Sequence, residues 1–219
     1  MASRPLNIKT QSWIPTQIPT SKNLTQSSNF FEQECLKFPG VGQFHTYVEL
    51  LHAALLEARH TVIRYVPQPL RFRIGSKSYI PDVYVETRTG AQVIELKPRG
   101  DFSEDRRQLL RDYCATRNVE FIVLANEWVY EQQLKAENWL TIIRTLVNGK
   151  EQDSERSEQH IIDLLAHHDS ITLRHILDFG DRQGSICSEI ALFRLLHQGR
   201  IHANLDLKQL DLETEFYLC

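Results

Sequence analysis

Apolar residues recur along the first 150 positions with two different periods, and these periods predict alternating helices and strands. Between residues 46 and 60, Val48, Leu51, Leu55 and Ala58 follow the three-to-four-residue spacing of a helix with one buried face. Other runs are shorter and rich in β-branched and aromatic residues, which is typical of strands. We predict strands at 62–66, 70–74 and 121–125, a hairpin over 79–97 that turns near 88–90, and helices at 103–117 and 128–147. This order predicts an α/β fold.

A polar segment at 148–157 separates this region from a second group of elements. The segment begins with Asn-Gly, a pair that commonly ends a helix, and we therefore place a domain boundary there. Three short helical patterns and two β-like runs come after it, at 160–166, 173–177, 188–197, 200–207 and 215–218. Because three helices and then a small hairpin form the order of a winged helix, we predict a winged-helix-like domain at 157–219 after a first domain at 31–148.

Residues 1–30 differ from the rest of the chain in composition. They are rich in Ser, Thr, Gln and Pro, and they carry Arg4, Lys9 and Lys22 with no acidic residue before Glu32. This composition favours a flexible basic arm. Charge patterning alone leaves two alternatives open, a plain tail and an arm that contacts DNA or a partner protein.

Bulk composition narrows the protein class. The chain has 219 residues, 42% of them hydrophobic and 24% charged, which is typical of a folded globular protein. No run approaches the roughly 18 consecutive apolar residues of a membrane span, and the N-terminus lacks the apolar core of a signal peptide. We therefore expect no membrane association and a cytoplasmic location. The four cysteines show no C-x-x-C spacing, so neither a zinc knuckle nor a disulfide framework is indicated.

The net charge argues against a protein that binds DNA without partners. It is −3 at pH 7 with a sequence pI near 6.3, whereas free-standing DNA-binding proteins neutralise phosphates with an excess of basic residues. If this chain acts on nucleic acid, we expect partner proteins to help recruit it.

Three charged residues stand out in the hairpin over 79–97. A turn centred between Arg88 and Thr89 places Asp82 directly opposite Glu95 on the neighbouring strand, and Lys97 follows two residues later on the face of Glu95. Like charges at opposed positions destabilise a hairpin. A divalent cation between the two carboxylates would remove that conflict.

Mg²⁺ suits such a pair of carboxylates. It prefers hard oxygen ligands, commonly one or two carboxylates, and it keeps waters that can be exchanged or activated. An ammonium group such as that of Lys97 positions an attacking water or stabilises charge that develops on phosphate. The trio therefore contains the minimal parts for phosphodiester hydrolysis, although a solvent-facing hairpin with an incidental Glu95–Lys97 pair explains the three residues equally simply.

Glu49 extends the pattern from the hairpin to the first helix. On its own, the T-x-x-E sequence from Thr46 to Glu49 predicts a capping box, in which the Glu side chain bonds back to the helix start. Together with the hairpin residues it gives a longer pattern, because a helix glutamate, Pro81-Asp82 and Glu95-Leu96-Lys97 occur in the order of the PD-(D/E)xK nuclease motif.

The flanking residues resemble those of TnsA-type transposon-end endonucleases, from about Phe44 to the C-terminus. In that family a helix glutamate leads to a "V..Y..QP" strand and then to "Y.PD" and "E.K". The corresponding residues are Glu49, Tyr65 with Gln68-Pro69, Tyr79 to Asp82, and Glu95-Leu96-Lys97.

The resemblance implies a fold, a site and partners. The fold would be a restriction-endonuclease-like core, a mixed sheet flanked by helices. Mg²⁺, with Mn²⁺ able to substitute, would be held by Asp82, Glu95 and the backbone carbonyl of Leu96. Glu49 would bind a second metal or a water, and Lys97 would position the nucleophile.

In such systems the endonuclease cuts the 5′, non-transferred strands at the ends of a Tn7-like element. A DDE transposase of the TnsB type cuts and joins the 3′ ends, and an AAA+ regulator of the TnsC type faces the small C-terminal domain. The expected location is the bacterial cytoplasm, at the nucleoid when the protein acts.

Other candidates and other functions remain open. Gln68 lies between two prolines and either shapes a loop or reaches DNA. Arg106, Arg107 and Arg111 either contact phosphates or form a solvated helix face. The alternative functions are a catalytically silent nuclease-fold adaptor that binds DNA or transposition proteins, and another PD-(D/E)xK nuclease such as a junction resolvase or a host-defence enzyme.

Overall fold

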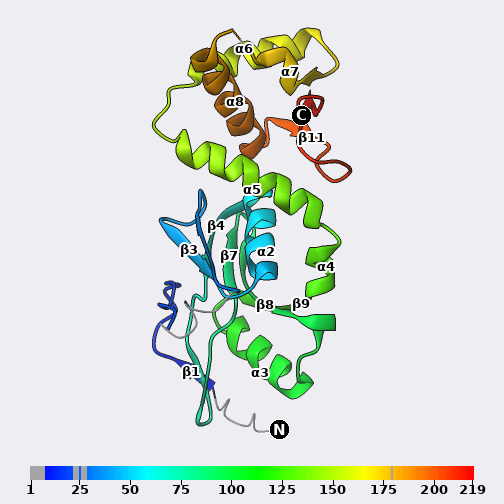
Figure 1. Cartoon of the computed structure of the whole chain (residues 1–219). Helices are drawn as coiled ribbons and strands as arrows, with labels where there is room; N and C mark the ends of the chain where they lie inside the picture. The colour runs from blue at the N-terminus through cyan, green and yellow to red at the C-terminus, as the bar shows by residue number, and fades with distance from the viewer. Residues whose placement is uncertain (1–7, 22–24, 26–28, 179) are drawn as a thin grey trace. The chain divides into compact units, whose positions relative to one another are not determined.

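The computed structural model describes residues 8–21, 25, 29–178 and 180–219, and it separates into two compact units (Figure 1). The first unit contains the chain up to His52 together with Thr61–Glu131, and the second contains Ala53–His60 together with Gln132–Cys219. Helix α2 (Tyr47–Ala58) contributes its first turns to one unit and its last turns to the other. The candidate site lies in the first unit.

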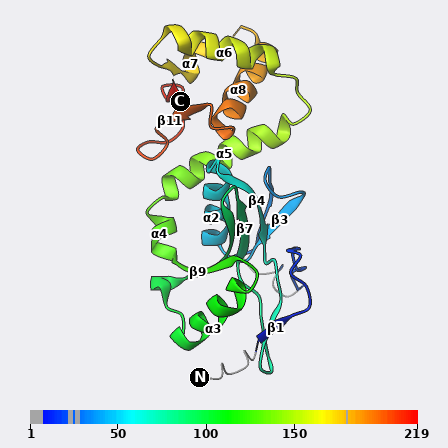
Figure 2. The same ribbon diagram turned by 180° about the vertical axis from the view of Figure 1, so that it is seen from behind.

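A four-stranded mixed sheet forms the centre of the first unit (Figure 2). Its strand order is β4 (Val62–Pro67), β7 (Val83–Thr87), β8 (Gly90–Lys97) and β9 (Val119–Ala125). The first two pairings are antiparallel, and β8 pairs with β9 in parallel. The connection between β8 and β9 contains a short turn, η1 (Pro98–Gly100), and α3 (Glu104–Ala115), which packs against β9. This mixed α/β arrangement fits the expected restriction-endonuclease-like core.

The sequence of β8 explains its central position. Val93, Ile94, Glu95 and Leu96 are all buried, so both faces of the strand are covered. Continuous burial of this kind is typical of an interior strand. Glu95 is the single charged residue in this buried run, and its carboxylate therefore requires partners inside the protein.

Two smaller sheets complete the first unit. Strands β2 (Phe31–Glu34) and β3 (Val41–Phe44) form an antiparallel hairpin. Strands β1 (Ile8–Thr10), β5 (Phe72–Ile74) and β6 (Lys77–Tyr79) form an antiparallel sheet in the order β1-β5-β6. The buried face of that second sheet joins a core that includes Phe72, Leu110 and Phe121.

Strand β1 differs from the flexible arm expected over residues 1–30. Ile8 is buried while Lys9 is exposed, and the Thr10 amide donates a hydrogen bond of 3.0 Å to the Tyr113 hydroxyl. Trp13 packs on the Phe72 ring with a centroid distance of 5.8 Å. Long-range apolar contacts therefore hold this part of the arm, although its composition is polar. Arg4 and Lys22 lie outside the described residues.

The second unit contains helices and a small antiparallel sheet. After the last turns of α2 come α5 (Gln133–Asn148), α6 (Glu155–His167), β10 (Ile171–Thr172), α7 (Leu173–Ile176), α8 (Arg182–His197), β11 (Ile201–Ala203) and β12 (Glu215–Leu218). The strand order of its sheet is β10-β12-β11. The winged-helix interpretation of 157–219 stays a prediction.

Two element boundaries differ from the sequence predictions. The helix expected over 128–147 is divided into α4 (Asn126–Tyr130) and α5, and α8 begins at Arg182 because Asp181 caps it by accepting a hydrogen bond from the Gly184 amide. The compact division places α5 with the second unit, whereas the sequence pattern predicts a boundary after this helix. That boundary, at 148–157, stays a prediction. Among the described helices, none is both long and apolar enough to cross a membrane.

Candidate active site

The register of the β7–β8 hairpin brings Asp82 and Glu95 to the same end of the sheet. Thr87 pairs with Gly90 and Val83 pairs with Ile94, which confirms the predicted turn centre between residues 88 and 89. The paired ladder ends one position before Asp82 and Glu95. The two acidic residues therefore lie where the two strands begin to separate.

The Glu95 carboxylate is buried and fixed at both oxygens. Its residue is 3% exposed. Oε2 accepts a hydrogen bond of 2.7 Å from the Tyr79 hydroxyl, and Oε1 lies 2.7 Å from the ammonium nitrogen of Lys97. Burial lowers the pKa of Lys97, but the hydrogen bond and charge of Glu95 outweigh it, so that the pKa is raised above its ordinary value. Lys97 is therefore a cation at neutral pH, and its side chain is 37% exposed.

Asp82 is crowded by other acidic groups. Its Oδ2 accepts a hydrogen bond of 2.6 Å from the Leu96 amide. Burial and then the charges of Glu95 and Glu49 nevertheless hold the pKa of Asp82 well above its ordinary value, against the opposing effects of the Leu96 bond and Lys97. Three carboxyl groups thus interact electrostatically at one place, with one ammonium group beside them.

Glu49 bonds back to the start of α2, as its sequence pattern predicts, with the backbone donor at His45, the residue before the Thr46 N-cap. Its Oε1 accepts a hydrogen bond of 3.0 Å from the Thr46 hydroxyl, and its Oε2 accepts one of 3.0 Å from the His45 amide. The Thr46 hydroxyl in turn accepts from the Glu49 amide at 3.3 Å. Since the charge of Glu49 also raises the pKa of Asp82, the residue caps α2 and lies within electrostatic reach of the hairpin site.

Gln68 connects Glu49 to the hairpin from a buried position. Its Nε2 donates a hydrogen bond of 2.9 Å to Glu49, and its backbone amide donates one of 2.8 Å to the Asp82 carbonyl. Its φ of 40° is unusual for a residue with a side chain. The residue is only 4% exposed, which favours the structural alternative over direct DNA contact. Within the described part of the chain, its buried Oε1 has no hydrogen-bond partner.

The three arginines of α3 have different surroundings. The guanidinium of Arg106 lies over the Tyr79 ring at 4.1 Å from the centroid, an arrangement that favours a cation–π interaction. Arg107 bonds to the Gly100 carbonyl at 3.0 Å and lies 3.4 Å from Glu104, so it supports local structure. Arg111 is exposed. Of the three, Arg106 is therefore the one associated with the candidate site, through Tyr79.

Tyr79 belongs to this site, although the sequence pattern alone assigns no role to its side chain. It is 8% exposed, and the pKa of its hydroxyl is raised by burial and by the charge of Glu95. The hydroxyl therefore stays protonated and donates to Glu95. A buried tyrosine normally requires a polar partner for its hydroxyl. The acidic residues that follow Tyr79 in the sequence are the signal that could have indicated such a partner.

The side chains as arranged form a pair of acids rather than a complete ligand cluster. Over the described ranges, no group of three or more His, Cys, Asp or Glu side chains is placed to hold a metal ion.

A comparison with protein families identifies the segment that carries this geometry. Residues 59–126 match the family model described as TnsA-like endonuclease N terminal. This segment is similar to the N-terminal domain of TnsA-like endonucleases. It contains Asp82, Glu95, Lys97 and Gln68, whereas Glu49 precedes it. No curated protein matches the chain. The resemblance to TnsA-type endonucleases is thus confirmed for this segment, and the match supports a nuclease of a Tn7-like system.

Replacing Tyr79 with phenylalanine tests the hydrogen bond to Glu95. Tyr79→Phe keeps the ring under Arg106 but leaves one oxygen of a buried carboxylate without its donor, and we expect a loss of about 1–3 kcal/mol in the free energy of unfolding. Urea unfolding without metal measures this change. Tyr84→Phe, on the half-buried side of β7, is the control, and we expect a change within about 0.5 kcal/mol. Equal effects of the two substitutions would contradict the assigned role.

Replacing Asp82 with asparagine tests the repulsion among the acidic groups. Because the folded-state pKa of Asp82 lies above the unfolded-state value, the folded chain binds the proton more tightly, and the charged form destabilises the fold at high pH. We expect metal-free Asp82→Asn to be more stable than the unsubstituted chain at pH 8. This gain should shrink as the pH falls through the folded-state pKa and vanish below the ordinary value of 3.8.

Thermal unfolding in EDTA across this pH range measures the effect. Asp112→Asn is the matched control, because Asp112 is exposed on α3 and should show no comparable gain at pH 8. A destabilised Asp82→Asn at pH 8 would mean that Leu96 and Lys97 outweigh the acidic neighbours.

Proposed function

We propose that this protein is a Mg²⁺-dependent DNA endonuclease of a Tn7-like transposition system. It hydrolyses the 5′, non-transferred strands at transposon ends, while a DDE transposase of the TnsB type processes the 3′ ends. The observation that carries the proposal is the placement of Asp82 and Glu95 at one end of the sheet in the TnsA-like segment, crowded enough to raise the pKa of Asp82 and accompanied by Lys97.

The donor set supports a hard divalent cation. Asp82 and Glu95 offer carboxylate oxygens. The backbone carbonyl of Leu96, the residue between Glu95 and Lys97, offers a neutral oxygen. The mutual repulsion of the acids is the energetic conflict that a cation relieves. Mg²⁺ usually needs only one or two protein carboxylates, since waters and phosphate oxygens complete its coordination. A pair of acids is therefore sufficient, and Mn²⁺ has the same oxygen preference.

The protein groups have separate roles in this proposal. When bound, the metal ion supplies Lewis-acid activation of water and of the scissile phosphate. Tyr79 holds Glu95 in place through its hydroxyl, and Gln68 holds both Glu49 and the backbone at Asp82. Lys97 has the charge and the partial exposure needed to hold a water or a phosphate oxygen at the site. Glu49 keeps its cap and adds negative charge that favours cation or water binding.

The second unit is proposed to serve partner contact. The order α6, β10, α7, α8, β11 and β12 supports a winged-helix-like domain, and we propose that it faces an AAA+ regulator of the TnsC type. Recruitment by partners is consistent with the net charge of −3. The protein would act in the bacterial cytoplasm, at the nucleoid.

A silent adaptor is the second candidate, and one observation favours it. Within the described residues, the carboxylate of Glu49 bonds to His45, Thr46 and Gln68, and each of these contacts supports the local fold. If Glu49 serves only α2 and the loop, the domain has fewer acidic groups for chemistry than its family motif provides.

A cleavage assay separates the candidates. DNA carrying transposon ends is incubated with Mg²⁺, the DDE transposase, the AAA+ regulator and either the native chain or a variant, and cuts on each strand are quantified. We expect Asp82→Ala, Glu95→Ala and Lys97→Ala each to reduce 5′-strand cleavage at least about 100-fold, while 3′-strand cleavage by the transposase continues. Glu86→Ala, which removes a half-buried carboxylate paired with Arg64, should cut like the native chain.

Undiminished 5′ cleavage by Asp82→Ala would show that this site does not catalyse the reaction. A native chain that supports assembly but never cuts the 5′ strand would be an adaptor. Cutting of branched DNA by the lone chain would favour the resolvase or host-defence alternative.

A further inference from the structure

The β1-β5-β6 sheet has one apolar face and one basic face. Ile8, Phe72 and Tyr79 are buried in the core of the first unit. Residues at alternate positions project to the opposite side of a sheet. Lys9, Arg73 and Ser78 are cross-strand partners in the register, and all three are exposed.

The arrangement of cations on this face is unfavourable for the sheet itself. Lys9 lies directly opposite Arg73, and like charges at opposed positions destabilise strand pairing. Arg71 precedes Arg73 by two positions and is also exposed. The neighbouring segments contain no acidic residue: none occurs before Glu32 or between Ala58 and Pro81. Among the ion pairs of the described residues, none involves these three cations, so the face carries a concentrated and unneutralised positive charge.

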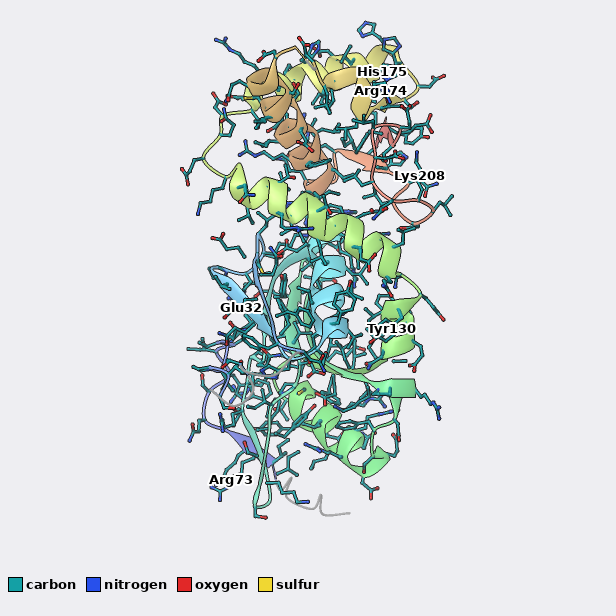
Figure 3. All side chains as sticks on the ribbon, in the orientation of Figure 1. Glu32, Arg73, Tyr130, Arg174, His175 and Lys208 are labelled. Carbon is teal, nitrogen blue, oxygen red and sulfur yellow. The ribbon has the colours of Figure 1, made fainter. Side chains whose placement is uncertain are left out.

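A groove of about 510 Å³ follows this face. Its lining consists almost entirely of cationic and small polar residues, namely Lys9, Thr10, Gln11, Arg71, Arg73, Ser76 and Ser78, with Phe72 beneath them. Arg73, labelled in Figure 3, lies on the β5–β6 hairpin. We define Lys9, Arg71 and Arg73 with this polar lining as the basic face.

We propose that the basic face binds the sugar-phosphate backbone of the DNA that enters the candidate active site. This inference rests on the nuclease function proposed above and adds a substrate-binding surface to it. Arg, Lys, Ser, Thr and Gln side chains make most backbone contacts in protein–DNA complexes, and these contacts position the protein without reading sequence. The lining has this composition. It lacks the exposed aromatic anchors that dominate protein–protein interfaces, and the DNA backbone is therefore the occupant that fits it.

The position of β6 connects the basic face to the acidic site. Ser78 precedes Asp82 by four residues, and four residues of chain span at most about 14 Å. Since each strand of B-DNA rises about 3.4 Å per phosphate, this span corresponds to about four phosphates. A duplex whose scissile phosphate lies at Asp82 and Glu95 therefore has further phosphates within reach of Ser78, at the edge of the basic face, and Arg73 lies opposite Ser78 on the neighbouring strand.

The test is DNA binding by the full chain in EDTA, so that cleavage plays no part. Fluorescence anisotropy measures the affinity for a labelled duplex of about three helical turns across a range of salt concentrations. We expect Arg71→Gln/Arg73→Gln to weaken binding and to reduce the slope of log affinity against log salt by about 1.8, since each lost phosphate contact contributes about 0.9. Arg88→Gln/Arg117→Gln removes two exposed cations elsewhere in the same unit and should bind like the native chain.

Stability and competing ligands complete the design. Because Arg73 opposes Lys9, the Arg71→Gln/Arg73→Gln variant should unfold at the same or a higher temperature, which separates lost binding from misfolding. Unchanged affinity and salt slope in that variant, or no duplex binding by the native chain even at low salt, where phosphate contacts are screened least, would overturn the inference. The inference would also be overturned if Arg71→Gln/Arg73→Gln lost binding to phosphatidylglycerol vesicles but bound the duplex like the native chain. If the variant lost duplex binding while the native chain never cut the 5′ strand, the DNA-binding role of the basic face would be supported and the proposed nuclease function would be rejected.

Discussion

The arrangement of the first unit depends on one constraint: two carboxyl groups, those of Asp82 and Glu95, lie close together. Bringing like charges together under partial burial is unfavourable, and the raised pKa of Asp82 records that conflict. The surrounding structure supplies donors rather than further apolar contacts. Leu96, Tyr79 and Lys97 each direct a hydrogen-bond donor at one of the two acids. The fold therefore maintains a local concentration of negative charge that it would not retain for stability alone.

The elements that meet this constraint come from distant parts of the chain. The β7–β8 register sets the spacing of the two acids, and the β1-β5-β6 sheet positions Tyr79 beside Glu95. That small sheet has a second role if its exposed cations bind DNA, because one strand then connects substrate binding to the acidic site. Gln68, in an unusual backbone conformation, joins Glu49 to the backbone at Asp82. Positive backbone angles of this kind persist where surrounding contacts determine them.

Local patterns in the sequence predict the hairpin and its three charged residues, because a two-residue turn and strand alternation together determine which side chains are opposed. The same reasoning identifies both roles available to Glu49, capping and charge. Strand β1 is not predicted, since its polar neighbourhood obscures one buried isoleucine and its stability comes from pairing with residues more than sixty positions away. The division between α4 and α5 carries no Gly or Pro signal. Contacts distant in sequence decide these features, and local propensity does not reveal them.

The central claim is that the acidic pair exists to hold a divalent cation, and calorimetric titration of Mg²⁺ tests it most directly. We expect binding to the native chain that strengthens as the pH rises, because the proton held by Asp82, whose pKa is raised, competes with the metal. We also expect Asp82→Ala and Glu95→Ala each to abolish this binding, while Glu86→Ala retains it. Mg²⁺ binding that survives both substitutions, or no binding to the native chain with or without duplex DNA, would contradict the claim.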